Sequence, residues 1–256
     1  MLDIRDLSIQ FPTSATPVVD SVSFQIPTGH TVGLVGESGS GKSLTALSLM
    51  RLTPPEAHIQ GQILWNNRDI LTLTDAELRQ LRGAELGMIF QNPLAALNPV
   101  YSIGDQLIET IRFHHHVSHD IAKTMAIDWL NRVKIPHPET RLQDYPHEFS
   151  LGMCQRVMIA LTLAMSPKLL IADEPTASLD VTVQADILDL LTTLKHEQQL
   201  SMLLISHDMA IVANRCDWVM VMCAGHIVEQ GIPRDIFTNA QHPYTRSLIA
   251  AIPRLS

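Results

Sequence analysis

Short, continuous apolar runs recur along the chain, and amphipathic stretches lie between them. Four of these runs predict buried strands, at 31–35, 86–90, 169–172 and 202–206. Helical spacing follows three of them, at 43–50, 181–196 and 209–216. Because strands that alternate with helices form parallel sheets covered on both faces, the pattern predicts a mainly parallel α/β core.

The N-terminal residues have a different pattern, in which apolar and polar positions alternate. The alternation over 2–9 changes phase near Asp6, and a second strand is predicted over 18–26. Residues 63–67 have the pattern of half a hairpin, and a complete hairpin is predicted at 218–230. Alternation of this kind is typical of strands with one buried face.

Strand signals disappear in the middle of the chain. Two amphipathic helices are expected there, over 103–113 and 121–133. We interpret 92–165 as a helical subdomain inserted into a single domain, whose nucleotide-binding core is formed by 1–91 and 166–256.

The stretch from Gly36 to Ser43 matches the P-loop pattern G-x-x-x-x-G-K-[ST] and lies between a predicted strand and a predicted helix. Its glycines let successive N–H groups turn toward an anion, and the start of the helix adds the positive end of a dipole. Lys42 is expected to reach the β- and γ-phosphates, and Ser43 to ligate Mg²⁺. The alternative is a glycine-rich turn with a surface lysine. The predicted phosphate-binding residues are Gly36, Glu37, Ser38, Gly39, Ser40, Gly41, Lys42 and Ser43.

Composition and charge narrow the possible functions. The chain has 256 residues, of which 46% are hydrophobic, and a formal net charge of −8 with only 18 Lys and Arg. This balance argues against nucleic acid as a partner, because phosphate contacts need clustered cations. The three cysteines, Cys154, Cys216 and Cys223, form no CxxC pair, which favours a reducing compartment. No apolar run reaches the length of about 18 residues that a membrane span needs, and the N-terminus lacks the features of a secretory signal.

Polar residues follow the other predicted core strands. Asp173 ends an apolar strand, where Mg²⁺ is the obvious partner for a buried carboxylate. Glu174 is placed to accept a proton from a water molecule or to orient it, although an acidic pair at a strand end is also consistent with a helix cap. Gln91 and His207 each follow another strand, and each alone is also consistent with a solvated or structural residue. Because ligands bind at the carboxyl ends of parallel strands, these residues and the P-loop are expected at one edge.

In this order and spacing, the motifs resemble those of an ABC-transporter ATPase, and the resemblance extends over nearly the whole chain. It rests on the P-loop, Gln91, the signature-like Phe149-Ser150-Leu151-Gly152-Met153, the strand ending in Asp173-Glu174, Ser178-Leu179-Asp180 and His207. It implies an α/β fold: a P-loop NTPase core with a mainly parallel sheet, an N-terminal antiparallel β subdomain and an inserted helical subdomain. Further stretches look like the dipeptide, oligopeptide and nickel importers: Ile89-Phe90-Gln91-Asn92-Pro93, Ala172-Asp173-Glu174-Pro175-Thr176, Asp180-Val181-Thr182-Val183-Gln184-Ala185 and His242-Pro243-Tyr244-Thr245.

The resemblance implies a dimer that clamps two ATPs, each between the P-loop of one subunit and the signature of the other. By position it assigns catalytic roles to Lys42, Gln91, Glu174 and His207. It assigns Mg²⁺ binding to Ser43, Gln91 and Asp173. It assigns further nucleotide contacts to Phe11, Ser150, Gly152 and Asp180. The implied cofactors are ATP and Mg²⁺. Glu174 would activate water, and His207 would contact the γ-phosphate. Phe11 is at the position of an aromatic ring that stacks on adenine, and a core phenylalanine at a strand end is the alternative.

The implied partners are a second ATPase subunit, two integral-membrane permease subunits and, indirectly, an extracytoplasmic solute-binding protein. The chain would then lie on the cytoplasmic face of the inner (plasma) membrane, where Gln91 and the helical subdomain couple ATP-driven closure to the permease. The cargo stays open between peptides and nickel or a metal chelate. The short end at 252–256 resembles the nickel-type members more, because peptide-importing members commonly continue into a cysteine-containing extension.

Two local features depart from the family pattern or suggest other chemistry. Leu151 replaces a glycine of the signature, and its side chain is expected to hinder close approach to the γ-phosphate of the partner's ATP. We therefore expect a heterodimer with two unequal ATP sites. The run from His114 to His116, with His119, is expected in a solvated loop, and metal sensing is the alternative.

Other classes of protein explain fewer of the motifs. A soluble ABC ATPase of DNA repair or translation would carry a long coiled-coil insert or two ATPase domains, whereas this chain has one domain and a compact insert. A P-loop kinase acting on a small molecule would leave Ser150, Asp180 and His207 unexplained. A subunit that only binds nucleotide is disfavoured by the presence of Lys42 and Glu174.

Overall fold

The computed structural model describes residues 1–252, whose internal contacts divide the chain into two compact units. Residues 1–78 and those from 200 onward form the first unit, and residues 79–199 form the second. This division differs from the predicted one, in which 92–165 alone forms the helical subdomain. The functional subdivision of the chain therefore stays a prediction.

The first unit contains an antiparallel sheet of four strands in the order β2-β1-β4-β5. Their bounds are β1 (Leu2–Gln10), β2 (Val19–Ile26), β4 (His58–Trp65) and β5 (Arg68–Asp69). The predicted change of phase is confirmed as an irregularity between Ile4 and Leu7, where Asp6 has a φ of 49°. The bulge keeps Leu2, Ile4, Leu7 and Ile9 all buried. The predicted N-terminal β subdomain is therefore confirmed.

A second group of strands in the first unit is mainly parallel. β3 (Thr31–Val35) lies between β8 (Ser201–Ser206) and β9 (Trp218–Cys223) and is parallel to both, and β10 (His226–Gly231) is antiparallel to β9. Val35 pairs with Ser206 and Val221. The residues that follow β3 and β8 therefore leave the sheet at the same edge.

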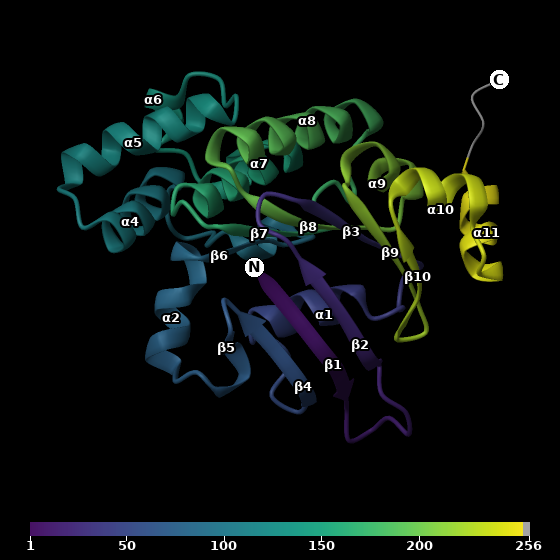
Figure 1. Ribbon diagram of the computed structural model, residues 1–256. Helices are drawn as coiled ribbons and strands as arrows, with labels where there is room; N and C mark the ends of the chain where they lie inside the picture. Colours follow the sequence, from purple (N-terminus) through teal and green to yellow (C-terminus); the bar gives the residue numbers. More distant parts are fainter. Residues whose placement is uncertain (253–256) are drawn as a thin grey trace. The chain divides into compact units, whose positions relative to one another are not determined.

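Helices accompany the strands of the first unit. They are α1 (Lys42–Leu49), α9 (Met209–Arg215), α10 (Pro233–Asn239) and α11 (Pro243–Ala250), with the short 3-10 helix η1 (Ile70–Thr72). Figure 1 shows α9 and α10 beside β9 and β10. The helices α10 and α11 have no counterpart among the predicted elements. They pack their apolar residues onto a core cluster that includes Val35, Val219 and Val221.

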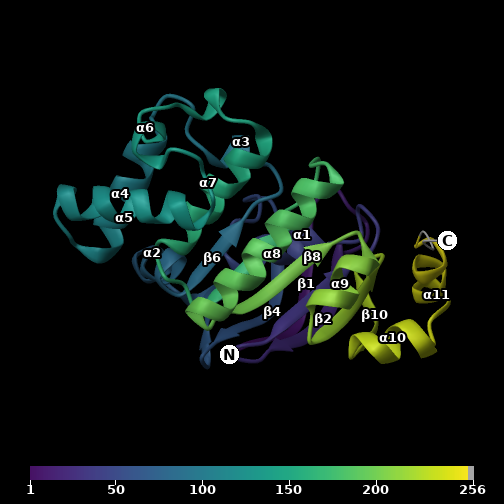
Figure 2. The same cartoon turned by 90° about the horizontal axis from the view of Figure 1, so that it is seen from above.

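The second unit combines one parallel strand pair with most of the helices. β6 (Leu86–Ile89) pairs with β7 (Leu169–Asp173). The helices are α3 (Pro93–Ala96), α4 (Ile103–His115), α5 (His119–Arg132), α6 (Pro138–Arg141), α7 (Leu151–Leu163) and α8 (Val181–Gln198), with the 3-10 helix η2 (Pro146–Glu148). The boundary between the two units falls within α2 (Asp75–Ala84). α7 packs directly on β6, since a Cβ atom placed on Gly87 would lie 2.8 Å from the methyl carbon of Thr162. Figures 1 and 2 show α4, α5 and α7 together.

The expected loop at His114–His116 is wrong. His114 and His115 form the last turn of α4, and His116 ends the helix with a φ of 54°. A ring nitrogen of His115 lies 2.6 Å from the carbonyl oxygen of Ala164, which holds that imidazole at the end of α7. Burial, followed by the charges of His115 and His116, lowers the pKa of His114. Within residues 1–252, no three His, Cys, Asp or Glu side chains come together as a metal site.

None of the helices within the described part of the chain is both long enough and apolar enough to span a membrane. The helices of the second unit have separate buried and exposed faces. On α4, Ile103, Leu107 and Ile111 are fully buried at a spacing of four residues, whereas the side chain of Phe113 is 66% exposed.

We expect Ile111→Ala to lower the free energy of unfolding by about 2–5 kcal/mol, because it leaves a cavity in the core of the helical unit. Phe113→Ala is the matched control on the same helix and should change it by less than about 0.5 kcal/mol. Urea denaturation followed by circular dichroism measures both. Equal effects of the two substitutions would show that the buried face of α4 is assigned wrongly.

Candidate functional site

The P-loop connects the end of β3 to the start of α1. Gly41 caps α1 with a φ of 107°, a left-handed backbone that favours glycine. Gly36 is required for a different reason, because a Cβ atom there would collide with the main-chain oxygen of Met222 on β9. The loop is also fixed from outside, since the N–H group of Gly225 donates to the carbonyl oxygen of Ser40 at 3.0 Å.

Lys42 is the buried cation of this loop. Its side chain is only 4% exposed, and its ammonium group donates to the carbonyl oxygens of Gly36 and Glu37, both at 2.8 Å. The hydroxyl of Ser40 lies 3.5 Å from the same nitrogen. A charge enclosed in this way, at the N-terminal end of a helix, suits an anion such as a phosphate group.

Two other predicted residues lie in the same unit as the P-loop. His207 directly follows β8 and is exposed, and because Val35 pairs with Ser206 it leaves the sheet at the edge where the P-loop begins. Phe11 directly follows β1 and is half-buried. Phe11 begins the loop between β1 and β2, and this loop ends at Val18. Val18 lies close to the P-loop, because its carbonyl oxygen would be 3.0 Å from a Cβ atom placed on Gly41. The first unit therefore contains Phe11, the whole P-loop and His207.

The second unit brings Gln91 and Glu174 together. Ile89 pairs with Ala172, so the residues after β6 and β7 leave the strand pair at one end. The amide nitrogen of Gln91 donates to a carboxylate oxygen of Glu174 at 3.2 Å. Glu174 has a φ of 44°, an uncommon backbone for a residue other than glycine. Asp173, the last residue of β7, is 5% exposed.

The signature-like residues also lie in the second unit, at helix starts. The hydroxyl of Ser150 caps α7 by accepting from the N–H group of Met153 at 3.3 Å. Asp180 caps α8 in the same way, with the N–H group of Val183 at 3.0 Å. A Cβ atom on Gly152 would approach Val183 to 3.0 Å, so the starts of α7 and α8 lie close together.

Leu151, which replaces a glycine of the signature, lies at the start of a helix. This residue is the first of α7, is half-buried and is not among the residues with positive φ. Leucine therefore replaces glycine here without backbone strain. Any effect of the side chain must be on what approaches this helix start. Cys154 is fully buried, and burial raises the pKa of its thiol.

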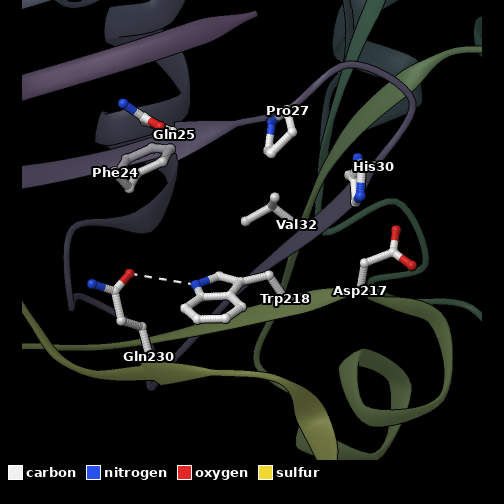
Figure 3. Close-up of a pocket in the computed structure, with 8 residues that line it drawn as sticks. All are labelled: Phe24, Gln25, Pro27, His30, Val32, Asp217, Trp218 and Gln230. Carbon is white, nitrogen blue, oxygen red and sulfur yellow. Dashed lines mark hydrogen bonds between the residues drawn. The ribbon is translucent and has the colours of Figure 1, made fainter.

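A separate groove of about 610 Å³ lies in the first unit (Figure 3). Its lining residues are Phe24, Gln25, Pro27, His30, Val32, Asp217, Trp218 and Gln230. Val32 and Trp218 stand near the beginnings of β3 and β9, so the groove is at the opposite end of these strands from the P-loop. No predicted site residue lines it.

One contact to the P-loop had no counterpart among the predictions. The hydroxyl of Tyr244 on α11 accepts a hydrogen bond from the N–H group of Glu37 at 2.9 Å. The only sequence signal was that Tyr244 belongs to the His-Pro-Tyr-Thr stretch quoted for the resemblance. Neither periodicity nor spacing indicated a contact between residues so far apart in the chain.

The sequence and the fold of this chain are similar to those of known proteins. The sequence profile of the family described as "ABC transporter" matches residues 19–177. The dipeptide transport ATP-binding protein DppD of Haemophilus influenzae is 44% identical, and the match covers 100% of this chain and 78% of DppD. The oligopeptide transport ATP-binding protein OppD of Escherichia coli is 46% identical, and the match covers 100% of this chain and 76% of OppD. The ATP-binding cassette MJ0796, solved as a dimer in a post-hydrolysis state with ADP and Pi, has a TM-score of 0.81 at 24% identity, covering 91% of this chain and 99% of that one. The structure of cbiO1 from Clostridium perfringens, part of the complex cbiONQ, has a TM-score of 0.78 at 28% identity, covering 93% and 90%.

We expect Gly36→Ala to weaken the binding of a fluorescent ATP analogue about tenfold or more, because the added methyl group displaces the loop from β9. Gly231→Ala is the control, since its Cβ atom would lie 3.5 Å from Ile236, an ordinary contact. Equilibrium fluorescence titration of both variants measures the effect. Unchanged affinity of Gly36→Ala would contradict the close approach of the loop to Met222.

Proposed function

The chain belongs to the ABC transporter family and is an ATPase, and from this premise we propose that it energises the import of peptides through a membrane permease. The observation that carries the proposal is the similarity to peptide transport ATP-binding proteins at 44% to 46% identity over the whole of this chain. The proposed location is the cytoplasmic face of the membrane, with a solute-binding protein delivering the cargo to the permease on the other face.

Nickel or a metal chelate is the other cargo that the resemblance left open. The relatives named above are dipeptide and oligopeptide transport proteins, which favours peptides. Residues 252–256, whose shortness resembles the nickel-type members, lie largely outside the described part of the chain. Peptide import is therefore the proposal.

The proposed nucleotide contacts follow from the chemistry of the residues. Lys42 would keep its hydrogen bond to the carbonyl oxygen of Gly36 and exchange the one to Glu37 for phosphate oxygens, and the main-chain N–H groups near Gly41 would hold the same anion. The hydroxyl of Ser43 and the carboxylate of Asp173 would hold Mg²⁺, which neutralises charge on the phosphates when bound. Oxygen ligands of these types are the ones that Mg²⁺ prefers.

Glu174 is the proposed residue that orients or deprotonates the attacking water. Its carboxylate accepts a hydrogen bond from the neutral amide of Gln91. Because the amide carries no charge, the carboxylate can exchange this bond for one to water or to the metal, and no charged side chain loses its partner. Gln91 is proposed to contact Mg²⁺ or the water in this exchange. His207 would hydrogen-bond the γ-phosphate, because its position at the P-loop edge of the sheet is exposed.

We propose that the permease docks on a part of the second unit where large apolar side chains are exposed beside charged ones. Tyr101 and Phe113 are 52% and 66% exposed and line a groove of about 720 Å³ on α4. Val100, beside Tyr101 in the chain, is 73% exposed. Exposed side chains of this size mark interaction sites when they gather beside polar residues such as Asp105 and Arg112, which line the same groove. We therefore propose this groove as part of the permease contact.

A second ATPase subunit completes the proposed assembly. The nucleotide on this P-loop would meet the signature of the partner, while Ser150 and Gly152 would serve the nucleotide of the partner. Leu151 is the reason for proposing a heterodimer, since a branched side chain at the start of α7 would stand between the backbone and an approaching γ-phosphate. The proposed site on this P-loop is the intact one.

In the assembled transporter we expect Glu174→Gln to lower ATP turnover about a hundredfold or more while MgATP still binds, because the amide cannot accept a proton. Lys42→Ala should instead abolish binding and turnover together. Release of phosphate and uptake of a labelled peptide into proteoliposomes measure both steps. If nickel uptake, and no peptide uptake, depended on Glu174, the peptide proposal would be wrong while the ATPase assignment would stand.

We expect Leu151→Gly to raise turnover of the assembled transporter about two- to tenfold, the range that corresponds to about 0.5–1.5 kcal/mol for one recovered hydrogen bond of ordinary strength. Leu151→Ala keeps a Cβ atom and separates the effect of the branched side chain from that of the backbone. Trapped nucleotide should occupy the two sites more equally in the glycine variant. No change in turnover or occupancy would remove the case for unequal sites.

A further inference from the structure

The stretch His242-Pro243-Tyr244-Thr245, which neither the ATPase chemistry nor the permease contact uses, builds the start of α11. His242 caps the helix, its ring nitrogen accepting from the N–H group of Tyr244 at 3.2 Å. Pro243 occupies the first helical position, where a missing N–H group costs nothing. Thr245 is fully buried. Each residue therefore has a structural task, and together they fix where the side chain of Tyr244 stands.

Glu229 on β10 holds this helix start in place. Its two carboxylate oxygens accept from the N–H groups of Gln241 at 2.7 Å and His242 at 3.0 Å. Burial alone would raise the pKa of Glu229, but these hydrogen bonds outweigh it and the pKa is lowered. The carboxylate is therefore ionised at neutral pH, and it ties the start of α11 to the hairpin of β9 and β10.

The ring of Tyr244 packs on a core cluster with residues from β3, the strand that leads to the P-loop, and from β9. The cluster includes Val35, the residue directly before Gly36, and Val221 on β9. Burial raises the pKa of the Tyr244 hydroxyl, so that this group is neutral at physiological pH. The ring is thus fixed by packing, and only its hydroxyl reaches the P-loop.

The hydroxyl and the ammonium group of Lys42 hold the same peptide unit. The N–H group of Glu37 donates to Tyr244 at 2.9 Å, and the carbonyl oxygen of Gly36, which belongs to the same peptide plane, accepts from Lys42 at 2.8 Å. In a trans peptide these two groups point in opposite directions. The plane is therefore held from both sides, and its rotation would move the carbonyl oxygen away from Lys42.

We propose that Tyr244 is a positioning residue for the nucleotide site, which fixes the peptide plane between Gly36 and Glu37 and so orients the P-loop before nucleotide binds. The inference rests on the proposed ATP site at Lys42. A loop that is already oriented loses less conformational freedom on binding, so the contribution appears as affinity. Glu37 is exposed, so without the hydroxyl its N–H group turns to water, and the fold is expected to stay intact.

The test is Tyr244→Phe, which removes the hydroxyl and keeps the ring. We expect the KM for MgATP in the assembled transporter, and the Kd of the full chain for a fluorescent ATP analogue, to rise about three- to tenfold, the effect of losing one hydrogen bond. The value of kcat and the melting temperature without nucleotide should stay unchanged. Tyr145→Phe is the matched control, because it removes the same group from a side chain that is 41% exposed in the second unit.

Four results separate the explanations. Wild-type affinity in Tyr244→Phe, with loss in Tyr244→Ala, would show that the ring alone matters and would overturn the inference. A fall in kcat or in melting temperature with unchanged KM would do the same. The Lys42→Ala chain tests the underlying site. If it binds the ATP analogue as tightly as the wild type, the proposed ATP site itself is wrong. If Lys42→Ala loses affinity for the analogue and Tyr244→Phe does not, only the role of Tyr244 is rejected.

Discussion

The burial of one charged amine organises the first unit. An ammonium group with 4% of its side chain exposed is costly to remove from water, and main-chain oxygens of the loop around Lys42 offset part of this cost. These oxygens can turn inward only because Gly41 takes a left-handed backbone and Gly36 lies against β9 without a side chain. The parallel pairing of β3 with β8 and β9 then decides which other residues share the edge. An incoming phosphate replaces neutral partners with a charged one, which is why this loop suits an anion.

The acidic residues of the second unit depend on a different constraint. Asp173 is buried at the end of β7, whereas Glu174 turns away from the strand with a φ of 44°. Two adjacent carboxylates would repel each other if both pointed into one buried space. The left-handed backbone separates them and brings Glu174 to the amide of Gln91. An uncommon backbone of this kind costs of order 1 kcal/mol or more, and its presence at a predicted catalytic residue fits a functional reason for keeping it.

The sequence predicted most of this fold because its signals were local. The continuous apolar runs, the alternating N-terminal strands and the P-loop pattern all act within a few residues, and the structure confirms the elements that they predicted. The histidine run was misassigned because His115 is held by the carbonyl oxygen of Ala164, a tertiary contact that no local pattern records. For Leu151 the structure adds a local fact that the signature pattern does not contain: the residue begins α7 without a positive φ, so its Cβ atom causes no backbone strain. The predicted hindrance of an approaching γ-phosphate stays a prediction. The helices α10 and α11 are short and half-exposed, so their periodicity was too weak to detect.

The contact between Tyr244 and Glu37 shows why a site can include residues that its motif omits. A P-loop pattern specifies residue types where the side chain, or its absence, matters, and position 37 is one of its unspecified positions. The structure uses the main chain there instead. A hydroxyl can accept a hydrogen bond from residue 37 only if that residue has an N–H group, so proline at position 37 would leave Tyr244 without this role. The two positions are therefore linked through the backbone, and the His-Pro-Tyr-Thr stretch belongs with the P-loop even though about two hundred residues separate them.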